Sequence, residues 1–171
     1  MTTRPSDEAS GSGDGRWLSP SEQQAWRSYL RASRLLDDAL DDDLSEHGLQ
    51  MTEYEILAMV SEADGGHLRM SALADQVIQS RSRLTHTAGR LEKRGLVQRR
   101  PAADDRRGVD LWLTDRGARL LAELAPVHVA SVRKRLIDPL GEQGFAELGA
   151  AMATIRRHLL GLDPGSTDAV R

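Results

Sequence analysis

The spacing of apolar residues changes once along the chain, near residue 95, and this change constrains the fold more than any other feature. Before it, apolar residues recur at helical spacing in three segments, residues 52–64, 71–77 and 81–94. After it, residues 96–100 and 109–113 alternate as half-buried strands do, and the polar segment between them contains Pro and Gly. We therefore expect three helices followed by one β-hairpin.

Residues with strong capping preferences mark the ends of these helices. Ser80 is suited to cap the segment 81–94, and Gly95 suits its C-terminal end because glycine adopts positive φ at little cost. Thr52, followed three residues later by Glu55, matches a capping box that would open the first of the three helices. The helix boundaries are thus expected close to these residues.

Helical segments also flank this module on both sides. The first is expected to begin at a capping box of Ser19 and Glu22, and the next to be capped by Thr114 and interrupted or kinked near Pro126. A turn at 138–141 separates it from a last helix. In chain order we expect a disordered tail at 1–18, a flanking helix at 19–47, the module of three helices and hairpin at 48–114, flanking helices at 115–161 and a flexible tail at 162–171. The flanking helices carry more apolar residues than a monomer of this size needs.

Composition excludes several classes of protein. The sequence contains no Cys, which removes disulfides, thiolate metal sites and cysteine nucleophiles. Its first residues contain no apolar run, and no segment approaches the roughly 18 apolar residues of a membrane helix. We expect a cytoplasmic protein with no membrane partner.

Charge is distributed unevenly along the chain. The formal net charge is −3, yet residues 79–119 contain 11 basic and 5 acidic residues, a net charge of +6. The remaining residues therefore carry −9. A basic segment in an otherwise acidic protein favours a polyanionic partner, although a solvated helix face would give the same count.

The order helix, helix, helix, hairpin is typical of a winged helix-turn-helix, in which residues 81–94 would form the recognition helix. If Leu84, Ala88 and Leu91 face the core, the opposite face is cationic and rich in hydrogen-bonding groups, as reading the major groove requires. The residues of this helix expected to bind DNA are Arg81, Ser82, Arg83, Thr85, His86 and Arg90.

The expected hairpin turn is also charged, and we expect Asp105, Arg106 and Arg107 to bind DNA. An arginine at such a tip can enter the minor groove, where negative potential is concentrated. A neighbouring aspartate can hold its guanidinium by a bidentate pair. The alternative is an exposed turn whose charges only prevent aggregation of the hairpin edge.

Several motifs together resemble those of bacterial MarR-type transcription regulators. They are Met-Ser-Ala-Leu-Ala-Asp at 70–75, Arg-Leu-Glu-Lys-Arg-Gly-Leu-Val at 90–97, Asp-Arg-Arg-Gly-Val at 105–109 and Leu-Thr-Asp-Arg-Gly at 113–117. The resemblance spans roughly residues 20–160. It implies an obligate homodimer joined by the terminal helices, which binds double-stranded DNA at a pseudo-palindromic operator. It further implies a repressor that is released by a small aromatic or phenolic ligand, with Arg107 as the residue that enters the minor groove.

The resemblance also implies a ligand pocket between the dimerisation helices and the DNA-binding module. One subgroup senses urate-like anions with a tryptophan, an acidic residue and an arginine, although Glu55 stands where that subgroup has aspartate. A capping role is the alternative for Glu55. The candidate ligand-binding residues are Trp26 (or Trp17), Tyr29, Tyr54, Glu55 and Arg90.

No catalytic, metal or cofactor site is expected. The five histidines lack metal-binding spacing, and the sequence offers neither a nucleophile–base pair nor a glycine-rich phosphate loop. Two other functions remain open. One is a winged-helix module that binds protein instead of DNA, and the other is a DNA-binding activator without a ligand. The cationic face of segment 81–94 favours DNA.

Overall fold

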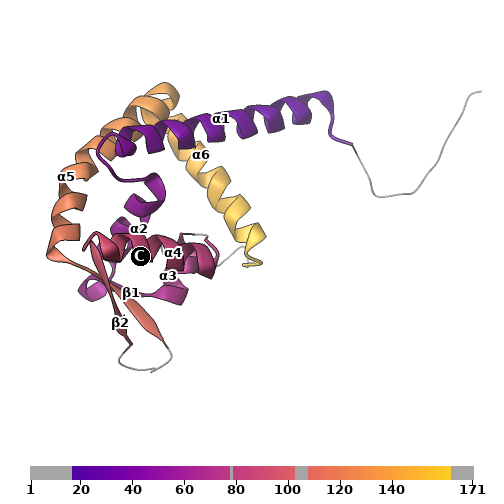
Figure 1. The fold of residues 1–171 in the computed structure, drawn as a ribbon. Helices are drawn as coiled ribbons and strands as arrows, with labels where there is room; N and C mark the ends of the chain where they lie inside the picture. The colour runs from indigo at the N-terminus through magenta and orange to yellow at the C-terminus, as the bar shows by residue number, and fades with distance from the viewer. Residues whose placement is uncertain (1–16, 78, 103–107, 163–171) are drawn as a thin grey trace, which may run out of the picture. The chain divides into compact units, whose positions relative to one another are not determined.

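The computed structural model describes residues 17–77, 79–102 and 108–162. The elements are α1 (Pro20–Ser45), α2 (Met51–Glu62), the 3-10 turn η1 (Asp64–Gly66), β1 (His67–Arg69), α3 (Met70–Gln76), α4 (Arg81–Lys93), β2 (Val97–Pro101), β3 (Val109–Leu113), α5 (Asp115–Val132), the π-helical η2 (Arg133–Ile137) and α6 (Asp138–Leu159). The chain divides within α1, after Leu35, into two compact units. The described residues form helices and one small sheet, which confirms the expected mainly α fold (Figure 1). In the described ranges no helix is both long and apolar enough to span a bilayer.

The core of the second unit lies among α2, α3, α4 and the sheet, which Figure 1 shows grouped together. Leu57 of α2 and Leu73 of α3 are fully buried. Leu84, Ala88 and Leu91 are buried too, which confirms the predicted orientation of α4. Because these three positions share one helix face, the opposite face is left to solvent.

The sheet has one more strand than the predicted hairpin. β2 and β3 pair antiparallel as expected, with Val97 opposite Leu113, and β1 pairs with the other edge of β3, with His67 opposite Trp112. The strand order is therefore β1-β3-β2. β1 is only three residues long and runs directly into α3, so no alternation of apolar residues marks it in the sequence.

Three predicted helix starts are confirmed, among them the Ser80 cap of α4 described below, and one is wrong. The Ser19 and Glu22 capping box is present, because each backbone N–H donates to the other side chain (2.7 and 3.3 Å). Thr114 caps α5 by accepting from Gly117 N (3.0 Å). The capping box of α2, however, is not Thr52 with Glu55. It begins two residues earlier, at Gln50, whose backbone N–H donates to Glu53 Oε2 (3.2 Å).

The path after α5 also differs from the prediction. Pro126 lies inside α5 without ending it, and α5 ends at Val132 where a π-helical turn begins. Helical backbone then continues into α6 and breaks only at Gly141, with φ of +69°. The predicted turn at 138–141 is thus confined to its glycine, the one residue there that adopts positive φ cheaply.

Candidate nucleic-acid interface

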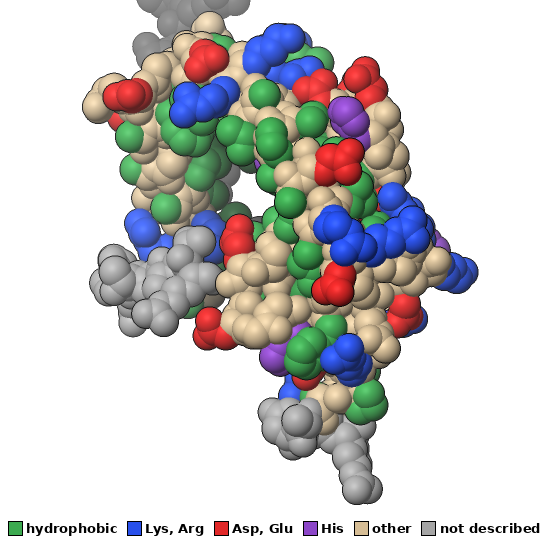
Figure 2. Space-filling view, turned by 90° about the vertical axis from the view of Figure 1, so that its left-hand side faces the viewer, with side chains coloured by type: hydrophobic (Ala, Val, Ile, Leu, Met, Phe, Trp, Pro, Cys, Tyr) green, Lys and Arg blue, Asp and Glu red, His purple; other side chains and the backbone are tan. Residues whose placement is uncertain are grey.

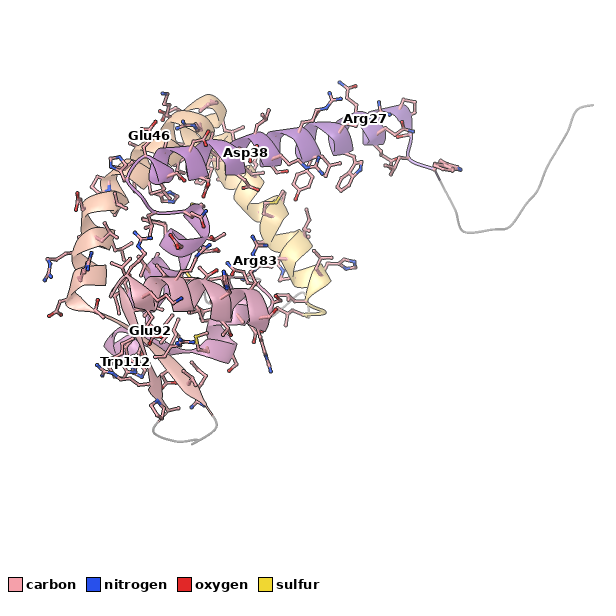
Figure 3. The ribbon with its side chains drawn as sticks, in the orientation of Figure 1. Arg27, Asp38, Glu46, Arg83, Glu92 and Trp112 are labelled. Carbon is pink, nitrogen blue, oxygen red and sulfur yellow. The ribbon has the colours of Figure 1, made fainter. Side chains whose placement is uncertain are left out.

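The caps of α4 fix where the helix begins and ends, and its buried residues determine which of its side chains are exposed. Ser80 Oγ accepts from Arg83 N (3.3 Å) at one end, and Gly95 takes a φ of +70° after the other. Side chains opposite the buried stripe are exposed (Arg83 is labelled in Figure 3). They are Arg81, Ser82, Arg83, Thr85, His86 and Lys93. Five of the six α4 residues predicted to contact DNA therefore share one exposed face.

The exposed side chains of α4 retain hydrogen-bonding capacity. Within the described part of the chain, the side chains of Arg81, Arg83 and His86 make no hydrogen bond or ion pair. Thr85 Oγ1 donates to Arg81 O (2.7 Å), and its oxygen remains an acceptor. This face can both donate to and accept from base edges, which is what the major groove demands.

Arg90, the sixth predicted residue, points to the start of α2 instead. Its Nη2 donates to Gln50 Oε1 (2.8 Å), and its Nε lies 3.3 Å from Glu53 Oε1. Arg94, one turn later, donates to Glu53 Oε2 (3.0 Å) and to Gly48 O (2.8 Å). Glu53 is buried, and its carboxylate pairs with the guanidinium of Arg90 in α4 and with that of Arg94, the C-cap of the same helix.

Glu53 is not among the functional residues expected from the sequence. Its position three residues after Gln50 was the available sign, but Thr52 and Glu55 show the same spacing. The structure gives Glu53 both the capping role and the two arginine partners. Glu53 thereby ties the start of α2 to α4.

The base of the wing is stabilised by stacking and ion pairs. His67 and Trp112 stack with ring centroids 4.0 Å apart, and the Arg100 guanidinium lies 4.6 Å from the Trp112 ring centre (Trp112 is labelled in Figure 3). Arg99 donates twice to Glu92 Oε2 (2.8 and 2.6 Å), which lowers the pKa of that carboxyl. The predicted DNA contacts Asp105, Arg106 and Arg107 lie outside the described residues.

Basic side chains also gather near the start of α5. Figure 2, viewed from the side of α5, shows Lys and Arg side chains across the middle of this face with acidic ones between them. Arg94, Arg116 and Arg119 line one recess of about 300 Å³ there, together with Glu123. The positive charge counted in residues 79–119 is therefore partly concentrated in space.

The candidate ligand-binding residues fall in different local environments. On α1, Trp26 and Tyr29 stack on each other, with ring centroids 5.7 Å apart, and both are about half exposed. On α2, Tyr54 is buried and lies against His128 of α5, with ring centroids 4.5 Å apart. Burial lowers the pKa of His128 and, with a smaller contribution from the charge of Glu62, raises the pKa of Tyr54.

Glu55 is half-buried, and burial raises the pKa of its carboxyl. Its expected capping role belongs to Glu53, and Arg90 pairs with Glu53. Among the described residues, no group of three His, Asp or Glu side chains is placed to hold a metal ion. Among the residues that the structure describes, Glu55 thus has neither the capping role nor an ion pair that would explain a half-buried acid.

Replacing Glu55 with Gln should raise the unfolding temperature at pH 7. The ionised carboxylate is disfavoured in the folded state, so its free-energy cost is present above the raised pKa and vanishes below the unfolded value near about 4.3. The gain measured by thermal unfolding should therefore disappear at about pH 4. Exposed Glu123, replaced by Gln, serves as the control and should change little. A loss of stability in Glu55→Gln at pH 7 would contradict this account.

Comparison with known proteins places the chain in a family. Residues 47–108 match a model of the MarR family. The chain is 31% identical over 131 residues to the HTH-type transcriptional regulator PecS of Dickeya dadantii (strain 3937), covering 76% of this chain and 78% of PecS. AbsC, a MarR family transcriptional regulator from Streptomyces coelicolor, is 45% identical, with a TM-score of 0.82 over 85% of this chain and 99% of AbsC. Sco3205 from the same organism, a MarR family regulator solved in complex with DNA, is 39% identical, with a TM-score of 0.82 over 90% of this chain and 96% of Sco3205. The chain therefore belongs to the MarR family of winged-helix, DNA-binding transcriptional regulators.

Proposed function

We propose that this chain is a homodimeric, sequence-specific regulator that represses transcription from a pseudo-palindromic operator and leaves it when a small aromatic or anionic ligand binds. The exposed face of α4 carries this proposal. It presents cationic and hydrogen-bonding side chains on a helix whose other face is fully buried, and a similar protein, Sco3205, was solved with DNA. Repression is the simpler mode, because a protein that covers an operator blocks transcription without a further contact surface.

The terminal helices support the homodimer. No residue of α6 is buried, although the helix and its end carry large apolar side chains. Exposed apolar residues in this region are Leu140, Phe145, Met152, Ile155, Leu159, Leu160 and Leu162. Apolar surface of this extent is normally covered by a partner, and a second copy would also match two recognition helices to half-sites about 34–36 Å apart.

The wing and the effector site belong to the same proposal. We assign Arg107 to the minor groove, with Asp105 orienting it and Arg106 beside it, on the strength of the Asp-x-Arg pattern alone. For effector response we propose Trp26 and Tyr29 on α1 and Tyr54 and Glu55 on α2. Support comes from the exposed aromatic stack on α1 and the unexplained half-buried acid on α2.

Three measurements on purified protein test the proposal. Light scattering after size exclusion should give a dimer, and gel-shift titration against DNA from upstream of its own gene should give a saturable complex. Salicylate or urate should then dissociate that complex. A protein that ignores DNA at low salt would overturn the proposal in favour of a protein-binding module. A promoter that becomes less active when the gene is deleted would identify an activator.

Replacing His86 with Ala should change which operators are bound, because His86 is exposed at the centre of the α4 face and can read base edges. Loss of one such contact should cost about 1–3 kcal/mol at the affected base pair and little elsewhere. Selection from a random duplex library measures this directly. Arg133→Gln, on η2, is the control and should leave the selected sequence unchanged. Equal losses on all operator variants would mean that His86 does not read bases.

A further inference from the structure

Gly89 lies in the interior of the recognition helix, on the side that faces away from the core. Residues three or four positions apart share one face of a helix. The row that contains Gly89 consists of Ser82, His86, Gly89 and Lys93. The side chains of the other three residues in this row are exposed, and Leu84 lies on the opposite, buried face. The row of exposed side chains is therefore interrupted at one position, where the surface of the helix is bare backbone.

The described chain contains no structural reason for a glycine at this position. Gly89 does not have positive φ, and the backbone of α4 is helical on both sides of it. A Cβ at this residue would meet no atom within 4 Å, so no neighbouring element in the described ranges needs the space. Glycine is also less favourable than alanine in a helix interior. A requirement for glycine can therefore come only from outside the described residues, and this face of α4 is the one proposed to bind DNA.

The length of α4 indicates which part of the DNA meets Gly89. The N-terminal residues of a recognition helix contact base edges. Successive helical residues advance by about 1.5 Å, so Lys93 lies about 16 Å beyond Ser82 along the helix axis, whereas the major groove is about 12 Å wide. If Ser82 and His86 face base edges, a sugar–phosphate strand that borders the groove therefore lies near Gly89 and Lys93.

We propose that a sugar–phosphate strand of the operator crosses α4 at Gly89, and that Lys93 binds a phosphate of this strand. This inference rests on the proposed DNA-binding function and specifies which part of α4 meets the DNA backbone. The missing side chain at Gly89 lets the strand approach the helix closely. Lys93, one turn later, is exposed and makes no hydrogen bond or ion pair with any described residue. Its ammonium is a point charge suited to a phosphate, so Lys93 is a contact residue and Gly89 a positioning residue.

Gly89→Ala and Gly89→Leu test the close approach. Both variants should unfold at a higher temperature than the wild type, because alanine and leucine are better helix formers than glycine. Both should nonetheless bind a library-selected duplex more weakly, by about tenfold for alanine and by more for leucine, because a side chain forced into a packed contact is unfavourable. A loss of affinity in a more stable protein cannot come from misfolding. Ala122→Leu, at an exposed position of α5, is the control and should leave the affinity unchanged.

Lys93→Gln tests the phosphate contact. Affinity should fall about tenfold, and by the same factor for the selected duplex and for its single-base variants, because a phosphate contact carries no sequence information. The slope of log K against log salt should shrink by about 0.9 for each bound chain. Lys93→Arg should keep that slope because it keeps the charge. In a Gly89→Leu background, Lys93→Gln should lose less than tenfold, since the strand is already displaced.

Three results would overturn this inference while the proposed function stands, because in each of them the wild type still binds its selected duplex. The first is an unchanged affinity in Gly89→Leu, and the second is an unchanged salt slope in Lys93→Gln. The third is a loss in Gly89→Ala that is restored when one thymine is replaced with uracil, which would place a base methyl group instead of the strand over Gly89. A wild type that binds no DNA at low salt would overturn the proposed function itself.

Discussion

Gly117→Ala should destabilise the fold by about 3 kcal/mol, lowering the unfolding temperature by about 6–12 °C. Gly117 lies in the first turn of α5, where a Cβ would overlap the Leu96 carbonyl oxygen and lie 2.8 Å from Leu113 Cδ1. That carbonyl cannot move aside easily. It accepts from Thr114 N (3.1 Å), and Thr114 Oγ1 also donates to the neighbouring Gly95 O (2.8 Å).

Gly89→Ala is the matched control for this prediction. Gly89 lies inside α4, and a Cβ there meets nothing within 4 Å among the described residues. Alanine is the better helix former, so this variant should gain about 0.5–1 kcal/mol. Thermal and urea unfolding of both variants measure the difference. Equal stability of Gly117→Ala and the wild type would show that α5 does not dock closely on the turn that leads from α4 into β2.

The same contact explains the Leu-Thr-x-x-Gly pattern at residues 113–117. Thr114 caps α5 by accepting from Gly117 N, and the cap packs on the turn that leads from α4 into β2. Glycine is required because the helix start and the Leu96 carbonyl are in direct contact. The motif therefore brings the end of the recognition helix, the wing and the start of α5 into direct contact.

Features that depend on neighbouring residues were predictable from the sequence. The Ser80 cap, the positive φ of Gly95 and the buried stripe of α4 all follow from residues within one or two turns. Local preferences decide such features before any tertiary contact forms. For this reason the exposed face of the recognition helix could be identified correctly.

Features that depend on distant partners were not predictable. β1 is three residues long and is a strand only because β3 offers its free edge. Gln50–Glu53 and Thr52–Glu55 are equally competent capping boxes in the sequence, and the start of α2 is at the first pair. The structure also gives Glu53 two arginine partners about 40 residues later in the chain, so Arg90, assigned to DNA by helix periodicity, turns toward α2.

Glu53→Gln should cost about 2 kcal/mol of stability, lowering the unfolding temperature by about 4–8 °C. Glutamine keeps the shape of the side chain but removes the charge that Arg90 and Arg94 share. The carboxylate is buried while both guanidiniums are partly exposed, so the cost should stay below that of breaking a fully buried pair. Urea unfolding with an unchanged m value would measure the loss as a change in stability alone.

Glu92→Gln tests whether the burial of a carboxylate, rather than its pairing with an arginine, decides how much stability is lost when its charge is removed. Glu92 also lies on α4 and also holds an arginine, with Arg99 Nη2 2.6 Å from its Oε2, yet both side chains are about one-third exposed. Solvent screens this pair, so its loss should cost less than about 1 kcal/mol despite the shorter distance. If Glu92→Gln proves as costly as Glu53→Gln, distance rather than burial decides these energies. Glu53 would then hold the recognition helix no more firmly than an ordinary surface pair.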